Sequence, residues 1–140
     1  MLSPVFSENG FNSRIWGPHL WKVMHILSLN YPLKPTRVHV DAYFNFFKSL
    51  CTILPCATCR KEFCSMVNLP GGPLELRPEI FMQKAGDAPG SARVRVINYI
   101  LALHDTVNRR LLKHGDVGKR RFVLKEPRYW VLKYAKLRAK

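Results

Sequence analysis

The sequence predicts an all-α protein, a small bundle of about five helices. Three observations predict this class: apolar residues recur at helical spacing in several segments, no stretch alternates with the two-residue period of a strand, and proline or glycine closes most segments. With 140 residues, 47% of them hydrophobic, the chain is long enough for one domain over residues 1–140 with its own core. The sequence contains no evident internal repeat.

The first helix is predicted to begin at Pro18, after an irregular lead-in over residues 1 to about 15. Proline suits a first helical turn because its missing N–H would have no helical partner there. Tyr31-Pro32 closes the segment, since a proline cannot continue a helix. The apolar stripe of this helix consists of Leu20, Trp21, Met24, Leu27 and Leu29.

The second helix is predicted from about Val38 to Leu54, with a phenylalanine-rich stripe that is typical of a core. This stripe consists of Ala42, Tyr43, Phe46, Phe47, Leu50 and Leu54. Pro55 ends the second helix and opens a short third one, "CATCRKEFCSMV" at residues 56–67. The run "NLPGGP" at residues 68–73 closes that helix.

A loop with about one helical turn is predicted for residues 74–91, and the fourth helix runs from there to about His114. Ser91 suits its N-cap and Gly115 its C′ position. Its buried side is predicted to hold Val94, Ile97, Leu101, His104, Val107, Asn108 and Leu111. The basic C-terminal segment, residues 115–140, is expected to contain a short fifth helix from about Glu126 to Ala139.

Basic residues far outnumber acidic ones. Lys and Arg number 23 against nine Asp and Glu, a net charge of +14 that is concentrated in residues 115–140. Such a charge favours anionic partners: nucleic acid, an acidic protein face or a phosphate-bearing cofactor. A well-solvated basic surface is the simpler explanation. If the charge is functional, the protein could be a basic helical module that binds nucleic acid, with structural or zinc-bound cysteines. This is one of two hypotheses for its function.

The N-terminus has no basic region followed by a long apolar one, so we expect no secretory signal. No apolar run approaches the length that spans a bilayer. We therefore expect an intracellular protein without a membrane span, in a compartment that the sequence does not identify.

The four cysteines follow one another at the spacing C-x₄-C-x₂-C-x₄-C, as Cys51, Cys56, Cys59 and Cys64. Structural zinc sites usually take two close pairs from two separated loops, so this spacing disfavours zinc. A C-x-x-C at a helix N-terminus favours a redox pair, because unpaired N–H groups and the helix dipole stabilise its first thiolate. A packed, inert pair is the other reading. For Cys51 and Cys64 we favour two buried free thiols over a second disulfide.

A helical redox protein without a thioredoxin-like sheet needs a cofactor as its oxidant. Three motifs indicate which cofactor this is. They are "WGPHLWKVMHILSLNYP" at residues 16–32, "FFKSLCTILPCATCRKEF" at residues 46–63 and "LHDTVNRRLLK" at residues 103–113. In this order they resemble the Erv/ALR family of FAD-linked sulfhydryl oxidases, and the "WGPHLW" opening resembles its short viral members. Singly, tryptophan and histidine on apolar faces are typical core residues; their occurrence together with C-x-x-C favours the oxidase.

The resemblance implies a four-helix bundle plus a short fifth helix, with FAD bound within the bundle. It implies an enzyme that forms disulfides in protein substrates through Cys56 and Cys59, passing electrons to FAD and then to O₂, which gives hydrogen peroxide. Cys59 would be the thiol next to the flavin and Cys56 the one that exchanges with substrate. The implied FAD-binding residues are Trp21, His25, Tyr31, His104, Val107, Asn108, Lys113 and Trp130; no metal is implied.

The chain also departs from the family pattern. Asp105 stands where the family usually has Asn, which puts one polar contact to FAD in doubt, and Pro18 stands where many cellular members have Arg. No cysteine follows Cys64, so a dithiol protein substrate or a separate relay protein must reach Cys56 directly. The resemblance further implies a homodimer and, for a viral member, a cytosolic, nuclear or virion-associated protein. An acidic partner or nucleic acid at the basic C-terminal segment completes the expected partners.

Overall fold

The computed structural model describes residues 9–113 and 132–137, and this part of the chain is helical, as predicted. It contains α1 (Ser13–Leu29), α2 (Arg37–Ile53), α3 (Ala57–Val67), the short 3₁₀ helix η2 (Pro78–Ile80) and α4 (Ser91–Lys113). Residues 132–135 form one further helical turn. Of the predicted fifth helix, residues 126–131 and 138–139 lie outside the described residues, as does Gly115. None of the helices described here is long and apolar enough to cross a membrane.

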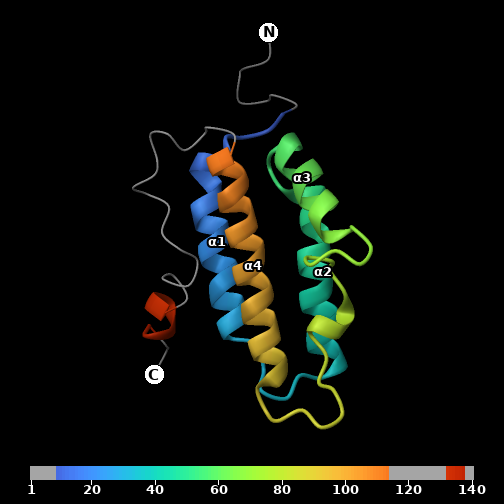
Figure 1. The fold of residues 1–140 in the computed structure, drawn as a ribbon. Helices are drawn as coiled ribbons and strands as arrows, with labels where there is room; N and C mark the ends of the chain where they lie inside the picture. The colour runs from blue at the N-terminus through green and yellow to red at the C-terminus, as the bar shows by residue number, and fades with distance from the viewer. Residues whose placement is uncertain (1–8, 114–131, 138–140) are drawn as a thin grey trace.

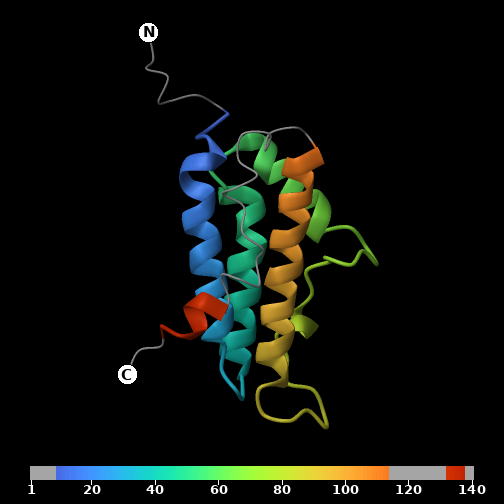
Figure 2. The ribbon, with the colours of Figure 1, turned by 60° about the vertical axis from the view of Figure 1, so that its left-hand side comes forward.

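The helices are arranged as two pairs around a common core. Figure 1 shows α1 lying along α4, with α2 and α3 together on the other side, where α3 packs against α2. Figure 2 shows the same arrangement turned about the vertical axis. The loop that carries η2 closes the core against α2 and α4. Phe47 of α2, Phe81 after η2 and Ile100 of α4 are fully buried where these parts meet. The rings of Phe47 and Phe81 stack with their centroids 6.0 Å apart.

The start of α1 differs from the prediction. The helix begins at Ser13 rather than Pro18, because Asn12 caps it: the Asn12 Oδ1 accepts a hydrogen bond from the Arg14 N–H at 3.0 Å. Pro18 therefore lies inside α1, and it is exposed. At this position the proline removes one backbone N–H donor from the helix. The Asn12 cap and the packing of α1 on α4 offset the loss of that hydrogen bond. The earlier start adds Trp16 to the same helix.

The bounds of α2, α3 and α4 agree with the prediction to within about a residue, but two predicted core positions are wrong. Ala42 is exposed, and Val40 is the buried residue near the start of α2. Val94 of α4 is 55% exposed. Because α4 packs against α1 on one side and the η2 loop on the other, its buried arc is rotated from the predicted stripe. This arc consists of Ala92, Val96, Tyr99, Ile100, Leu103, His104 and Asn108.

The predicted N-cap of α4 is also displaced. Ser91 is the first residue of the helix rather than its cap, because the carbonyl of Gly90 accepts the Val94 N–H at 3.0 Å. Gly90 has φ +90°, a conformation that glycine adopts without a steric penalty. A glycine cap therefore replaces the predicted serine cap.

Candidate functional site

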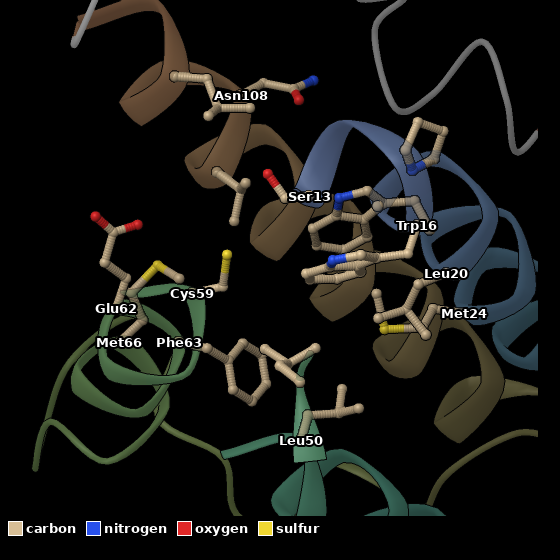
Figure 3. Close-up of a pocket in the computed structure, with 16 residues that line it drawn as sticks. Ser13, Trp16, Leu20, Met24, Leu50, Cys59, Glu62, Phe63, Met66 and Asn108 are labelled. Carbon is tan, nitrogen blue, oxygen red and sulfur yellow. The ribbon is translucent and has the colours of Figure 1, made fainter. Parts of the chain in front are cut away.

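A cavity opens between the α1–α4 pair and the α2–α3 pair at the end of the bundle where α3 begins (Figure 3). Its volume is about 920 Å³, counting the part that is open to solvent. The wall is mostly apolar and aromatic, with Asn108 and Glu62 among its few polar members.

A disulfide joins Cys56 and Cys59 at the edge of this cavity, with their Cα atoms 5.1 Å apart. Cys56 is the N-cap of α3, and its Sγ accepts a hydrogen bond from the Cys59 N–H at 3.2 Å. Cys59 lines the cavity, and Figure 3 shows its sulfur pointing into the open space; Cys56 is not among the lining residues. The two sulfurs are thus placed unequally.

Two tryptophans of α1 form the wall opposite Cys59. Trp16 and Trp21 both line the cavity, and the Trp16 Nε1–H donates to the Phe11 carbonyl at 3.0 Å. Trp21 stacks on His104 of α4, with ring centroids 4.1 Å apart and planes within 5° of parallel. Val107 and Asn108 continue this wall from α4. A flat aromatic ligand would find apolar faces on this side.

His25 and His104 form a buried pair behind Trp21. The His25 Nε2 and the His104 Nδ1 lie 2.7 Å apart, so one ring donates to the other. Burial lowers the pKa of His25 to about 4; burial, followed by the charge of His25, lowers the pKa of His104 to about 3. Both rings are therefore neutral at pH 7. The His25 Nδ1 is buried and has no hydrogen-bond partner among the described residues, and such an atom calls for an explanation.

Of the three other predicted FAD residues, Tyr31 lies elsewhere and the other two side chains are outside the described part of the structure. Tyr31 is fully buried away from the cavity lining, and its hydroxyl donates to the Phe81 carbonyl at 2.6 Å. Lys113 is the last residue of α4, and its side chain is outside the described part of the structure, as is all of Trp130. Asp105, the departure from the family pattern, forms an exposed ion pair with Arg109 one helical turn along α4.

Sequence reasoning missed several residues of the cavity. Trp16 was overlooked because the helix was expected to begin after it, although it lies four residues before Leu20 on the same face. Glu62 and Met66 follow Cys59 at helical spacing on α3, which would have been the signal for them.

The outer cysteines lie against each other between α2 and α3. Both are free in the structure, as expected, but they are half-buried rather than fully buried. The Cys64 Sγ–H donates to the Cys51 carbonyl at 3.6 Å. Burial, then the contact with Cys64, raises the pKa of Cys51 to about 11. Among the described residues, no group of three His, Cys, Asp or Glu side chains is placed to hold a metal ion.

The sequence is similar to one known protein family and to two named viral proteins. The Erv1 / Alr family model matches residues 18–126. A probable FAD-linked sulfhydryl oxidase, R368, of Acanthamoeba polyphaga mimivirus is 28% identical over 93 residues, covering 66% of this chain but only 56% of that protein. A putative FAD-linked sulfhydryl oxidase, 347L, of Invertebrate iridescent virus 6 is 28% identical over 100 residues, covering 71% of this chain and 81% of that protein. Both relatives are viral, in agreement with the resemblance of the opening motif. Because the family model spans well over half of the sequence, and its match includes the cysteine pair and most of the cavity wall, the chain belongs to the Erv1 / Alr family.

Proposed function

We propose that this protein is an FAD-linked sulfhydryl oxidase that forms disulfides in protein substrates through Cys56 and Cys59. The observation that carries the proposal is the position of Cys59: one sulfur of a disulfide at a helix N-terminus points into a cavity with apolar and aromatic walls. The names of the two viral relatives support the same activity.

The residues of the cavity fit a flavin. Trp16 and Trp21 offer flat apolar faces, Asn108 offers an amide that can donate and accept hydrogen bonds, and the unpartnered Nδ1 of His25 lies behind this wall. FAD bound there would supply a two-electron acceptor that returns the reduced cysteine pair to a disulfide and delivers the electrons to O₂, giving hydrogen peroxide. The residues that we propose to hold it are Trp16, Trp21, His25, His104, Val107 and Asn108. Tyr31, Lys113 and Trp130 remain proposals from the family resemblance alone.

The chain's own chemistry is thiol–disulfide exchange at Cys56. A substrate thiolate attacks the Cys56 sulfur, the Cys56–Cys59 bond breaks, and Cys59 leaves as a thiolate that takes up a proton. A second substrate thiolate attacks the substrate sulfur of this mixed disulfide, which releases Cys56. The substrate has then lost two electrons and two protons, and the pair has gained them. The α3 N-terminus and the Cys59 N–H stabilise the Cys56 thiolate when the second attack releases it.

The physiological dithiol partner meets Cys56 from outside the cavity, because Cys56 is not part of the cavity lining. The net charge of +14 supports an acidic partner protein or nucleic acid at the basic C-terminal segment as an addition to the oxidase. It does not require the alternative of a separate nucleic-acid-binding module, since the cysteines that this alternative would assign to zinc are a disulfide and a free pair.

The test of the proposal is the absorption spectrum of the purified full-length protein together with oxygen consumption. We expect a yellow protein that releases free FAD on denaturation and consumes O₂ with dithiothreitol. The Cys56→Ser/Cys59→Ser variant should keep the flavin and lose the oxygen consumption. A colourless protein, or a double variant that consumes O₂ as fast as the parent, would contradict the proposal.

A further inference from the structure

The short segment before α1 is hydrogen-bonded to the backbone on both sides of Cys56. We call residues 9–11 the strap. The Phe11 N–H donates to the Pro55 carbonyl at 2.7 Å, and the Ala57 N–H donates to the Asn9 carbonyl at 3.0 Å. Between these two bonds, Gly10 and Cys56 face each other in an isolated antiparallel bridge. The strap therefore fixes the peptide groups that flank the first cysteine of the pair.

Gly10 is a position that only glycine fits. Its φ is +82°, a conformation that other residues rarely adopt. A Cβ placed on it would also lie 2.5 Å from the Pro55 carbonyl oxygen and 3.2 Å from the Cys56 nitrogen. Both are backbone atoms, so no side-chain movement can relieve the contact. The close approach of the strap to the cysteine pair depends on the missing side chain.

The strap also connects the two halves of the site. The main helix contacts join α1 to α4 and α2 to α3, and the cavity lies between these pairs. Figure 1 shows the segment before α1 crossing from the upper end of α1 toward the start of α3. On the α1 side it is held by the Trp16 Nε1–H, which donates to the Phe11 carbonyl. The strap thus ties the tryptophan wall directly to the disulfide that faces it.

We propose that the strap is a positioning element for the redox pair, with Gly10 as its essential residue. This inference rests on the proposed redox role of Cys56 and Cys59. The strap holds Cys56 in the extended conformation of an N-cap, φ −159° and ψ 120°, in which its Sγ receives the Cys59 N–H. The same hydrogen bond stabilises the Cys56 thiolate after the disulfide is reduced. A protein whose reduced form is stabilised is a stronger oxidant of its substrate thiols.

Gly10→Ala tests the proposal in the full-length protein, with Gly71→Ala and Gly86→Ala as matched controls. These two glycines also have positive φ, +71° and +85°, but a Cβ on either would meet no atom within 4 Å. The three variants therefore share the conformational strain of alanine at positive φ, and only Gly10→Ala adds the clash with the strap's partner. The thermal midpoint of each variant is measured so that the comparison is made on folded protein.

The main readout is the equilibrium between the Cys56–Cys59 disulfide and a glutathione redox buffer, followed by alkylation and mass spectrometry under anaerobic conditions. We expect the equilibrium constant for reduction to fall about tenfold in Gly10→Ala, a shift of about 30 mV toward a weaker oxidant, and to stay near the parent value in both controls. Amide hydrogen exchange gives a second readout: the Phe11 and Ala57 amides should be protected in the parent and both controls, and should exchange faster in Gly10→Ala.

Two results would overturn the inference. One is an unchanged equilibrium in a folded Gly10→Ala protein whose Phe11 and Ala57 amides have lost protection. The other is absence of protection at these amides in the parent protein, which decides the question even if Gly10→Ala does not fold. Neither measurement uses oxygen consumption or bound flavin. Failure of the oxidase proposal would therefore appear separately, as a parent protein that does not turn over dithiothreitol.

Discussion

Trp21 and His104 lie face to face, one on α1 and one on α4, with ring centroids 4.1 Å apart and planes within 5° of parallel. They come from two of the motifs that carry the family resemblance, 83 residues apart in the chain by their numbers. The stack brings the two motifs together at the cavity wall, with Trp21 in the lining and His104 supporting it. His25 joins them through its hydrogen bond to His104. The motifs are therefore parts of one structural unit.

Removing the imidazole of His104 is expected to weaken FAD binding. His104→Ala deletes the ring on which Trp21 stacks, and aromatic pairs of this kind contribute about 0.5–1.5 kcal/mol beyond their buried area. We expect the dissociation constant of FAD to rise about tenfold, measured by titrating flavin-free protein and following flavin fluorescence. His19→Ala on the exposed side of α1 is the control and should bind as the parent does. An unchanged dissociation constant in His104→Ala would show that this wall does not hold the flavin.

The buried histidine pair should make the flavin-free protein less stable in acid. Both pKa values lie below the ordinary value, about 4 for His25 and about 3 for His104, so the folded state keeps the rings neutral while the unfolded chain binds protons below pH 6.5. Stability is then complete above pH 6.5 and is lost as pH falls toward the folded-state pKa values. At pH 5 we expect a loss of up to about 2 kcal/mol per histidine. Urea unfolding at pH 7 and pH 5 measures it.

The matched variants for this pH effect are His104→Gln and His19→Gln. The first should show a smaller loss of unfolding free energy between pH 7 and pH 5 than the parent, because one of the two titrating groups is gone. The second changes an exposed histidine of α1 and should behave as the parent. An equal loss in all three proteins would place the acid sensitivity in other groups.

Helix positions could be predicted from the sequence because their signals are local. Pro55 and the stripe around Phe47 predict the junction of α2 and α3, and the structure has it there. The start of α1 was missed because Asn12 and Pro18 compete as start signals, and the cap hydrogen bond that decides between them is visible only in the structure. The exposure of Val94 was missed because burial on α4 depends on which helices pack around it.

From the sequence, only those parts of the site could be predicted that depend on particular side-chain types. Cys59, Trp21 and Asn108 were expected at the cofactor, and they line one cavity. The strap could not be predicted, because its hydrogen bonds join backbone groups that every residue type has. Its one sequence signature is Gly10, and a glycine before a helix is compatible with many loops.

The outer cysteines give a prediction about reactivity. The denatured, oxidised protein should contain two free thiols, those of Cys51 and Cys64, and no free thiol would mean that they form a second disulfide. In the native protein the pKa of Cys51 is raised to about 11. Since the thiolate is the reactive form, its alkylation at pH 8 should be roughly a hundredfold slower than that of an ordinary exposed cysteine. The rate should rise about tenfold per pH unit up to pH 10, and the peptide bearing Cys51 identifies it.

The unequal placement of the redox cysteines gives opposite spectroscopic expectations for two similar variants. Cys56→Ser leaves Cys59 as a lone thiol that points into the cavity, where its thiolate would lie against bound flavin. This variant should be inactive with dithiols but show a long-wavelength thiolate-to-flavin charge-transfer band. Cys59→Ser keeps the sulfur of Cys56, which does not line the cavity, so it should be inactive without such a band.

The controls for these two variants are Cys51→Ser and Cys64→Ser, which change thiols outside the cavity lining and should keep most of the oxidase activity. They separate the loss of a particular sulfur from a general sensitivity to serine substitution in this part of the fold. A charge-transfer band in Cys59→Ser and not in Cys56→Ser would reverse the roles assigned to the pair. It would also move the exchange with substrate to Cys59, although that sulfur points into the cavity in the structure.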